Sequence, residues 1–385
     1  MSQSQKIILF LLSILAMVLL LVAGYYGAQA YQEWAQRPLG AALNSPTPRG
    51  LPPTWTASPG PKQTAILPGT LVPTLSFATN TPAIQPLCDG PYVMNILAIG
   101  TDSREDGYEY GLADVIRLVR VDFVTPRVTV LEFPRDLWVY IPEISDNING
   151  QDHEKLNQAY LYGNPGDGFH YWNDPSGGPG LLAQTLNLNF GAKPDRYIAV
   201  NMRTFVKVVD AVGGIDVELP ETVDGRSADD KSKRLLFLEG KHHLNGTQAL
   251  TLARIRIEGV FARADNQNIV LCALRKKLTS PDVITKIPQL IQSFQDNVQT
   301  DFTPEQISQL ACLAPRLSPE NIAFASFPQE LFKEARMYDP VFKKRVFIWD
   351  VDFKILREYT TRFQEGTWPG LISLPETGED TYICK

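Results

Sequence analysis

The feature that most constrains this chain is an uninterrupted apolar segment near its N-terminus. Ile7–Ala28 runs for 22 residues without a charged side chain, and about 20 such residues in a helix cross the apolar core of a bilayer. A cleaved signal peptide is the alternative, because Ala28-Gln29-Ala30 resembles a cleavage site, but signal peptides usually have an apolar region of only about 7–15 residues. We therefore predict a signal anchor over residues 7–28, a cytoplasmic tail over residues 1–6, and a single-pass membrane protein whose C-terminal part is extracytoplasmic.

A segment rich in Pro, Thr and Ser follows the predicted anchor. Pro38–Pro86 contains 11 of the 29 prolines and no acidic residue. Such a composition cannot bury enough apolar surface to offset the entropy lost on folding. We therefore predict a disordered linker over residues 29–87, which tethers a folded extracytoplasmic domain over residues 88–385.

The charge of the chain excludes one class of partner and indicates another. The formal net charge is -6, from 36 basic and 42 acidic residues, whereas proteins that bind nucleic acid usually carry a basic excess. Within Asn245–Lys277, however, six basic residues stand against two acidic ones. The sequence thus predicts no nucleic-acid partner, but a local site for a smaller anion.

The pattern after residue 88 alternates apolar runs with amphipathic segments. Met94–Gly100, Val115–Phe123 and Arg127–Phe133 have the composition of strands. Thr303-Pro304-Glu305-Gln306 is a capping box with Pro at the first helical position. Strands that alternate with helices indicate a layered α/β domain, with a largely central sheet between helices. Further elements are predicted at Gly180–Asn189, Tyr197–Val200, Arg203–Val212, Ile215–Leu219, Asn245–Ile257, Ala264–Leu278, Val283–Phe294, Arg345–Trp349 and Phe353–Phe363.

Charged side chains recur where the predicted elements end. Asp102 follows one strand and Asp114 precedes the next. Any one such residue is most often solvated, but Arg presents a planar donor fork that suits phosphate oxygens. Mg²⁺ takes carboxylate oxygens together with phosphate oxygens and water. The set predicts a phosphate or pyrophosphate site beside a divalent cation, and its basic members are Arg104, Arg135, Arg254, Arg256 and Arg263.

Several stretches occur in a recognisable order over residues 92–330. They are NILAIGTDSR, ADVIRLVRVD, LEFPRDLWVYIP, KLNQAY, VDAVGGIDVELP, LEGKHHLNGTQALTLARIR and RADNQ. In this order they resemble the LytR-CpsA-Psr (LCP) family of cell-envelope phosphotransferases. The PRD, KLNQAY and GxxALxxARxR elements make the resemblance specific, because no single one of them would suffice.

The resemblance implies a three-layer α/β/α LCP domain with a central mixed sheet, and it implies an activity. Members of this family transfer a glycopolymer phosphate from a polyprenyl-pyrophosphate carrier to a peptidoglycan hydroxyl, with Mg²⁺ (or Mn²⁺), and release polyprenyl phosphate. The implied partners are therefore the lipid-linked glycan, the peptidoglycan acceptor and the membrane. Apolar helices such as Gly180–Phe190 and Val283–Phe294 could line a groove for the lipid, although an ordinary core is the better interpretation for most of their residues.

The resemblance also assigns roles to individual residues. It implies that Asp102 and Asp114 bind the metal. It implies that Gln267 contacts the pyrophosphate of the lipid head group together with five arginines, namely Arg104, Arg135, Arg254, Arg256 and Arg263. Four of these arginines are implied to be catalytic: Arg135, Arg254, Arg256 and Arg263.

Three features depart from the family pattern. The usual basic residue just before Asp114 is absent, because Leu112-Ala113 precede it here. The family commonly carries an Asp three residues before the position of Arg263, and this chain has Val260 there. It commonly carries an Arg just before the position of Gln267, where this chain has Asn266. Glu258 could supply the missing carboxylate if the loop bends. The alternative to an active enzyme is a non-catalytic polyprenyl-pyrophosphate-binding paralogue or an envelope regulator.

Four cysteines follow the predicted anchor, in a compartment that permits disulfides. They allow three pairings, and four free thiols are the remaining possibility. We favour Cys88–Cys384, because the two ends of a domain often approach each other. We favour Cys272–Cys312 as the second pair, because these residues lie on two separate predicted helices.

Overall fold

A computed structural model describes most of the chain outside the predicted linker. The described residues are 3–43, 85–103, 108, 110–145, 150–164, 172–227, 229–255, 260–280, 283, 297–339, 342–370 and 381–384, and side chains are described in these ranges except at residues 3–16, 18–19, 260–264 and 381–383. Arg104, Arg256 and Glu258 therefore lie outside the described residues. So does nearly all of the predicted helix Val283–Phe294, of which only Val283 is described.

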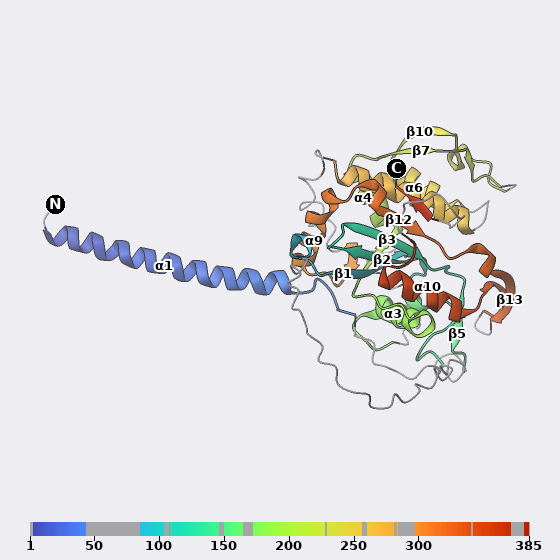
Figure 1. The fold of residues 1–385 in the computed structure, drawn as a ribbon, viewed down its shortest axis with the longest axis horizontal. Coiled ribbons are helices and arrows are strands. Elements are labelled where there is room, and N and C mark those ends of the chain that lie inside the picture. The colour runs from blue at the N-terminus through green and yellow to red at the C-terminus, as the bar shows by residue number, and fades with distance from the viewer. Residues whose placement is uncertain are drawn as a thin grey trace, which may run out of the picture.

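The chain begins with one long helix, α1 (Gln3–Gln36), which projects away from the folded domain (Figure 1). The predicted anchor, residues 7–28, falls within α1, and about half of its side chains lie outside the described ones. Among the described residues, no helix combines the length and the apolar character needed to cross a membrane. The segment after α1 contacts the domain, because Leu39 N donates to Phe302 O (3.0 Å) and Leu43 N donates to Asp301 Oδ2 (3.2 Å).

The centre of the domain is a seven-stranded mixed sheet with the order β11-β6-β1-β2-β3-β12-β15. The pairs β1–β6 and β3–β12 are parallel, and the other neighbouring pairs are antiparallel. The predicted central mixed sheet is therefore confirmed. Its strands are β1 (Val93–Thr101), β2 (Ala113–Asp122), β3 (Arg127–Glu132), β6 (Arg196–Asn201), β11 (Val298–Thr300), β12 (Ile322–Ala325) and β15 (Thr381–Ile383).

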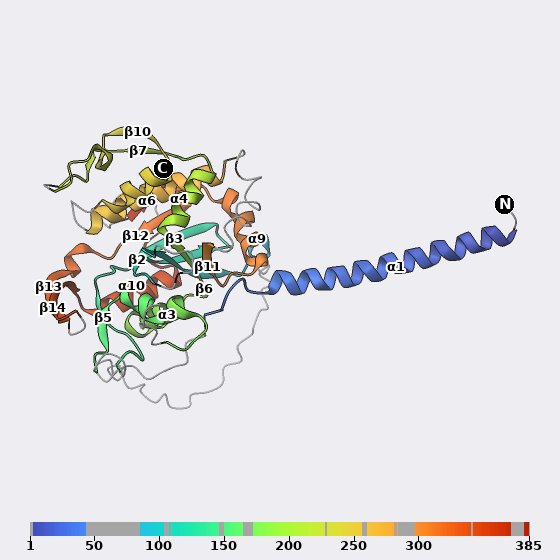
Figure 2. The same ribbon diagram turned by 180° about the vertical axis from the view of Figure 1, so that it is seen from behind.

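Helices cover both faces of this sheet, as Figures 1 and 2 show from opposite sides. One face carries α2 (Gln158–Gly163), α3 (Gly177–Phe190) and α10 (Phe353–Glu365). The opposite face carries α4 (Met202–Ala211), α5 (Gly246–Arg254) and α6 (Val260–Leu278). α9 (Pro304–Leu313) lies at the edge of the sheet near the end of α1. The layers are those of the predicted three-layer α/β/α domain.

Four two-stranded ribbons surround the sheet. β7 and β10 lie over the helices of the second face (Figure 1). β4 and β5 follow the end of β3, and the β13–β14 hairpin forms an outer edge of the domain. The ribbons are β4 (Trp138–Tyr140) with β5 (His153–Lys155), β7 (Ile215–Leu219) with β10 (Gly240–Leu244), β8 (Val223–Asp224) with β9 (Leu236–Phe237), and β13 (Lys333–Asp339) with β14 (Lys344–Asp350).

Local sequence signals explain where the helices begin and end. The predicted capping box at Thr303 is present, since its side chain accepts from Gln306 N and Pro304 is the first helical residue of α9. Asn245 caps α5 in the same way. α3 and α10 end at Gly191 and Gly366, whose φ angles of 71° and 77° are accessible to glycine without strain.

The face that carries α3 and α10 is filled by aromatic side chains. The Phe190 ring is fully buried and lies 5.4 Å from the Phe133 ring and 5.0 Å from the Phe353 ring, measured between centroids. Leu181, Leu182 and other α3 residues belong to the same cluster. The suggestion that Gly180–Phe190 lines a lipid groove is therefore wrong, because most of these side chains are buried in the core between the sheet and the helices α3 and α10.

The four cysteines form two disulfides, with a pairing that differs from the predicted one. Cys88 is bonded to Cys312 of α9, with Cα atoms 5.9 Å apart, and Cys272 of α6 is bonded to Cys384, with Cα atoms 5.4 Å apart. The predicted pairs Cys88–Cys384 and Cys272–Cys312 are wrong. The physical reason is that the two ends of the domain pack in different clusters, Cys88 beside α9 and Cys384 beside α6, so each end is tied to a helix rather than to the other end.

Candidate functional site

Charged side chains meet where β2 begins and β3 ends. The Arg135 guanidinium, just after β3, forms an ion pair with Asp114 of β2, and its Nε donates to Asp136 Oδ2 (3.2 Å). Lys155 Nζ donates to Asp136 Oδ1 (2.7 Å). The four side chains therefore form one line of alternating charge, Asp114–Arg135–Asp136–Lys155, of which the sequence predicted Arg135 and Asp114.

The KLNQAY motif connects these loops through its backbone. Asn157 N donates to Arg135 O (3.2 Å), and Asn157 O accepts from Ala113 N (3.2 Å). Leu156 N donates to Leu137 O (2.8 Å). The Asn157 side chain is buried, and its Oδ1 has no hydrogen-bond partner among the described residues. The motif thus fixes Arg135 relative to the start of β2.

The guanidinium of Arg135 stays protonated. Burial disfavours the charged form and works to lower the pKa of Arg135, but the neighbouring carboxylates of Asp114 and Asp136 outweigh it and raise the pKa above the ordinary value. Arg135 is therefore a permanent cation beside the strand ends. About a fifth of its side chain is exposed, so a ligand can reach it.

Asp102 lies directly after β1, one strand away from Asp114. Its Oδ1 accepts from Leu112 N (2.6 Å), and its own N donates to Leu112 O (3.1 Å). Among the described residues, no group of three His, Cys, Asp or Glu side chains is arranged to hold a metal. Two carboxylates at adjacent strand ends nevertheless fit Mg²⁺ held jointly with phosphate oxygens and water, which is the usual coordination of this ion.

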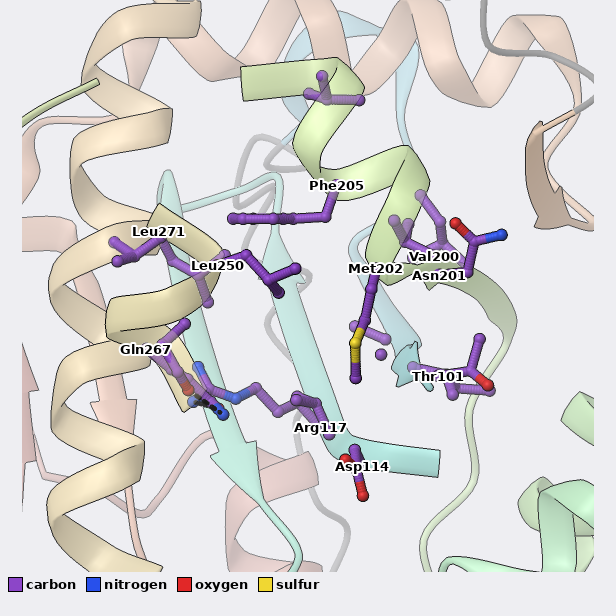
Figure 3. A pocket seen from close by; sticks show the side chains of 18 of the residues that line it. Thr101, Asp114, Arg117, Val200, Asn201, Met202, Phe205, Leu250, Gln267 and Leu271 are labelled. Atoms are coloured by element: carbon purple, nitrogen blue, oxygen red, sulfur yellow. Dashed lines mark hydrogen bonds between the residues drawn. The ribbon is translucent and has the colours of Figure 1, made fainter. Parts of the chain in front are cut away.

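A cavity of about 410 Å³ opens between the sheet and the helices α4, α5 and α6. Apolar side chains line most of it, including Phe205, Leu250 and Leu271 (Figure 3). Asp114 lies at one end of the cavity, below Arg117 in this view. The cavity is therefore an apolar chamber that meets the charged strand ends.

Arg117 is the charged residue that the sequence reasoning missed. It projects from β2 along the cavity wall toward α6 (Figure 3) and is only 3% exposed. Its Nη2 donates to Glu132 Oε2 (2.7 Å) and Gln267 Oε1 (3.0 Å), and its Nη1 donates to Asn268 Oδ1 (2.9 Å). The signal was present, because an Arg inside an otherwise apolar central strand must be paired or bound to a ligand.

Gln267 links three elements at the cavity. Its Oε1 accepts from Arg117, and its Nε2 donates to Ala253 O in the last turn of α5 (3.3 Å). These contacts join β2, α6 and α5 at one point. Arg254 follows Ala253, lines the cavity and is exposed. Gln267 therefore positions the segment that presents Arg254.

The structure brings together only some of the predicted site residues. Asp114, Arg254 and Gln267 line the cavity, and Arg135 is attached to Asp114. Arg263 and Val260 lie in the first two turns of α6, but their side chains are outside the described ones. Asn266 is buried, with 8% of its surface exposed. The positions of Arg104 and Arg256 stay predictions.

The fold and the site together define a three-layer α/β/α protein with an apolar cavity that ends at charged strand termini. Residues 81–359 match the sequence profile of the LytR_cpsA_psr family. Because this match covers more than half of the chain, the protein belongs to the LytR-CpsA-Psr family.

Two groups of sequence relatives carry different names. The polyisoprenyl-teichoic acid–peptidoglycan teichoic acid transferase TagV of Bacillus subtilis is 32% identical over 211 residues, which are 54% of this chain and 49% of that protein. TagU of Oceanobacillus iheyensis, named as the same kind of transferase, is 32% identical over 56% of this chain and 61% of that protein. The regulatory protein MsrR of Staphylococcus aureus is 29% identical over 56% and 58%. The chain thus spans about half to three fifths of the length of these curated relatives.

Solved structures share the fold. Bacillus subtilis TagV superposes with a TM-score of 0.53 and 24% identity, over 72% of this chain and 98% of that one. A structure described as TagT bound to LIIa-WTA superposes with a TM-score of 0.53 and 18% identity, over 74% and 97%. At these identities the likeness concerns the fold.

Proposed function

We propose that the protein transfers a glycopolymer phosphate from a polyprenyl-pyrophosphate carrier to a peptidoglycan hydroxyl during cell-envelope assembly. The observation that carries this proposal is the apolar cavity of about 410 Å³ that ends at Asp114 and Arg254. An apolar chamber beside basic side chains suits an amphiphile with an anionic head group. The names of TagV and TagU as teichoic acid transferases support the same activity.

The proposed reaction is a displacement at phosphorus. The acceptor hydroxyl oxygen attacks the phosphorus that carries the glycan, and the bond from this phosphorus to the bridging oxygen breaks. Polyprenyl phosphate leaves, and the proton of the hydroxyl is released to solvent. Positioning and charge neutralisation contribute most of the catalysis in such reactions. Arg135 and Arg254 would neutralise the phosphate oxygens, and Asp136 with Lys155 would hold Arg135 in place.

A divalent cation is part of the proposal. Mg²⁺ (or Mn²⁺) would be held by Asp102 and Asp114 and would supply additional neutralisation of phosphate charge. The Asp114 carboxylate is already shared with Arg135, so Arg135 would orient this carboxylate toward the metal. Gln267 would act indirectly, since Arg117 and Ala253 occupy its side-chain amide.

We also propose that the domain works at the outer surface of a membrane. The support is Ile7–Ala28, whose 22 uncharged residues suffice to span a bilayer as a helix. The short N-terminal tail would stay in the cytoplasm and the domain would be extracytoplasmic.

A non-catalytic lipid-binding paralogue or an envelope regulator is the second candidate. It is favoured by Val260 and Asn266, which stand where the family commonly carries Asp and Arg. The name of MsrR as a regulatory protein points the same way. This alternative retains the lipid cavity but predicts no turnover.

The test is an assay of the full-length protein in detergent with a lipid-linked glycopolymer, a peptidoglycan acceptor and Mg²⁺. We expect release of polyprenyl phosphate, which Asp102→Ala or Arg263→Ala abolishes and EDTA suppresses until Mg²⁺ is restored. Full activity in both variants would contradict the assigned site. Lipid binding without turnover, together with turnover gained by Val260→Asp, would establish the non-catalytic alternative.

A further inference from the structure

An exposed basic segment lies at the end of the β13–β14 hairpin, and we call its described residues, 336–339 and 342–345, the hairpin tip. The tip contains four basic residues and one acidic residue, within a chain whose net charge is -6. The acidic residue, Asp339, is fully buried, whereas the basic side chains are exposed. The basic residues are Arg336, Lys343, Lys344 and Arg345.

The pairing of the two strands arranges basic and aromatic side chains on one face. Arg336 is opposite Phe347, and Tyr338 is opposite Arg345. Directly opposed residues of an antiparallel pair project to the same side, so this face alternates guanidinium groups with rings. Tyr338 is 56% exposed, and the Phe342 ring in the turn is 50% exposed.

The charge of the tip is not neutralised by ion pairs with the acids that the structure describes. Within the part of the chain that the structure describes, none of its four basic side chains makes an ion pair, and the Lys344 ammonium lies over the Phe342 ring at 5.6 Å. Exposed aromatic side chains beside unpaired cations are unusual on a surface that contacts only water. The combination suits a ligand that offers both negative charge and carbon-rich faces.

The hairpin is connected directly to the proposed transfer site. Trp349 N donates to Asp136 O (3.1 Å), and Trp349 also bridges to Leu137. Four residues of strand, about 13 Å, separate Trp349 from Arg345. A chain that leaves the site at Arg135 therefore needs only a short extended path to reach the hairpin tip.

The position of the hairpin distinguishes between two anionic ligands, lipid head groups and a polymer that extends away from the membrane. In both overall views β13 lies on the side of the domain away from the point where α1 joins it (Figures 1 and 2). If α1 is anchored in a membrane, the hairpin tip faces away from lipid head groups. A polymer that extends outward from the transfer site is in the right place.

We infer that the hairpin tip binds a phosphate-bearing polyol or sugar polymer, namely the polymer part of the donor that emerges from the transfer site. This inference rests on the proposed function. The arginines would pair with successive phosphodiesters, and the rings of Tyr338 and Phe342 would pack against polyol or sugar carbons. The hairpin tip would keep a long donor polymer bound while the phosphate at the transfer site reacts.

The first experiment measures binding of lipid-free poly(glycerol phosphate) to the full-length protein in detergent. We expect the variant R336A/R345A to bind about tenfold more weakly, because two exposed ion pairs are lost. The control R226A/R234A removes two exposed arginines that are already paired with Asp224 and Asp230, and it should bind like the wild type. Equal binding by all three proteins would overturn the inference.

The second experiment separates this surface from the transfer site and from a membrane. Donors with one repeating unit should be transferred equally by the wild type and R336A/R345A, whereas donors with many units should show a raised KM in the variant only. An equal KM for long donors overturns the inference but leaves the proposed function intact. Absence of turnover with either donor rejects the proposed function, and the binding measurement still decides the inference. Loss of binding to phosphatidylglycerol vesicles with unchanged polymer binding would assign the hairpin tip to lipid instead.

Discussion

The two faces of the central sheet are built differently, although they share the same strands. The face under α3 and α10 is filled by rings such as Phe133, Phe190 and Phe327, all 1% exposed or less. The face under α4, α5 and α6 keeps a cavity of about 410 Å³. Protein interiors normally pack as densely as organic crystals. A cavity on one face therefore costs packing energy, which we attribute to binding of a ligand. The densely packed opposite face contributes most of the stability.

The strand β2 shows the same contrast within four residues. Arg117 projects to the cavity face and reaches Gln267 and Asn268 of α6. Arg120 projects to the other face, where its Nε donates to Gln364 O at the end of α10. Beside the cavity a polar junction links α6 to β2, and Leu271 and Cys272 of α6 add apolar contacts with β3 and β12. On the other face the aromatic core contacts α10.

The largest expected effect tests whether the packed face carries the stability. Phe190→Ala should lower the free energy of unfolding by about 3–5 kcal/mol, since it opens a void in a buried cluster. Phe205→Ala, beside the existing cavity, should cost only about 1 kcal/mol, since the ring is partly exposed and has fewer contacts to lose. Urea denaturation measures both. Equal losses would remove the distinction between the two faces.

The next effect tests whether the charged end of the cavity is used. Arg135→Ala should reduce the release of polyprenyl phosphate by about 100- to 1000-fold, the loss typical of a group that stabilises charge in a transition state. Arg127→Ala, at the opposite end of β3, is the matched control and should retain activity. A comparable loss in both variants would indicate that any change to this strand disturbs the fold.

The third prediction compares the two arginines of β2. Arg117→Met should destabilise the protein by about 3 kcal/mol, because it leaves Glu132 without its buried partner, and R117M/E132Q should recover part of this loss. Arg117→Met should also weaken binding of a polyprenyl-phosphate probe, since α6 is no longer fixed at the cavity. Arg120→Met should reduce stability without changing lipid affinity. Isothermal titration separates the two effects, and an equal affinity in both variants would contradict the assigned role of Arg117.

The last prediction concerns a buried acid next to the hairpin, and its effect is small over any single pH unit. Burial, with the charge of Asp339 as a second cause, raises the pKa of Glu154 to about 8. The folded state therefore holds a proton that the unfolded state releases near pH 4.5. Stability should decline as pH rises from about 4.5 to about 8, by at most about 1.4 kcal/mol per pH unit. Glu154→Gln should flatten this part of the profile in denaturation experiments, and an unchanged slope would show that another group titrates.

Features that depend on residues close together in the sequence were predicted correctly, whereas features that depend on residues far apart in the sequence were not. Capping at Thr303 and the strands that became β1, β2 and β3 depend on neighbours in the sequence, and both were predicted correctly. Asp114 and Arg135 were predicted as site residues at strand ends, but their ion pair was not predicted. The pairs Cys88–Cys312 and Cys272–Cys384 depend on which helix packs at each end of the domain. No local pattern contains that information.

By itself, the sequence determined the class of fold, the family and the charges gathered at the strand ends, because periodicity, caps and motif order are written in neighbouring residues. Only the tertiary structure decided which face of the sheet stays open, that Arg117 pairs with Gln267 at the cavity wall, and that the β13–β14 hairpin contacts Asp136 through Trp349. Each of these depends on contacts between elements far apart in the chain. Such contacts are fixed by how whole layers pack, and not by any single segment.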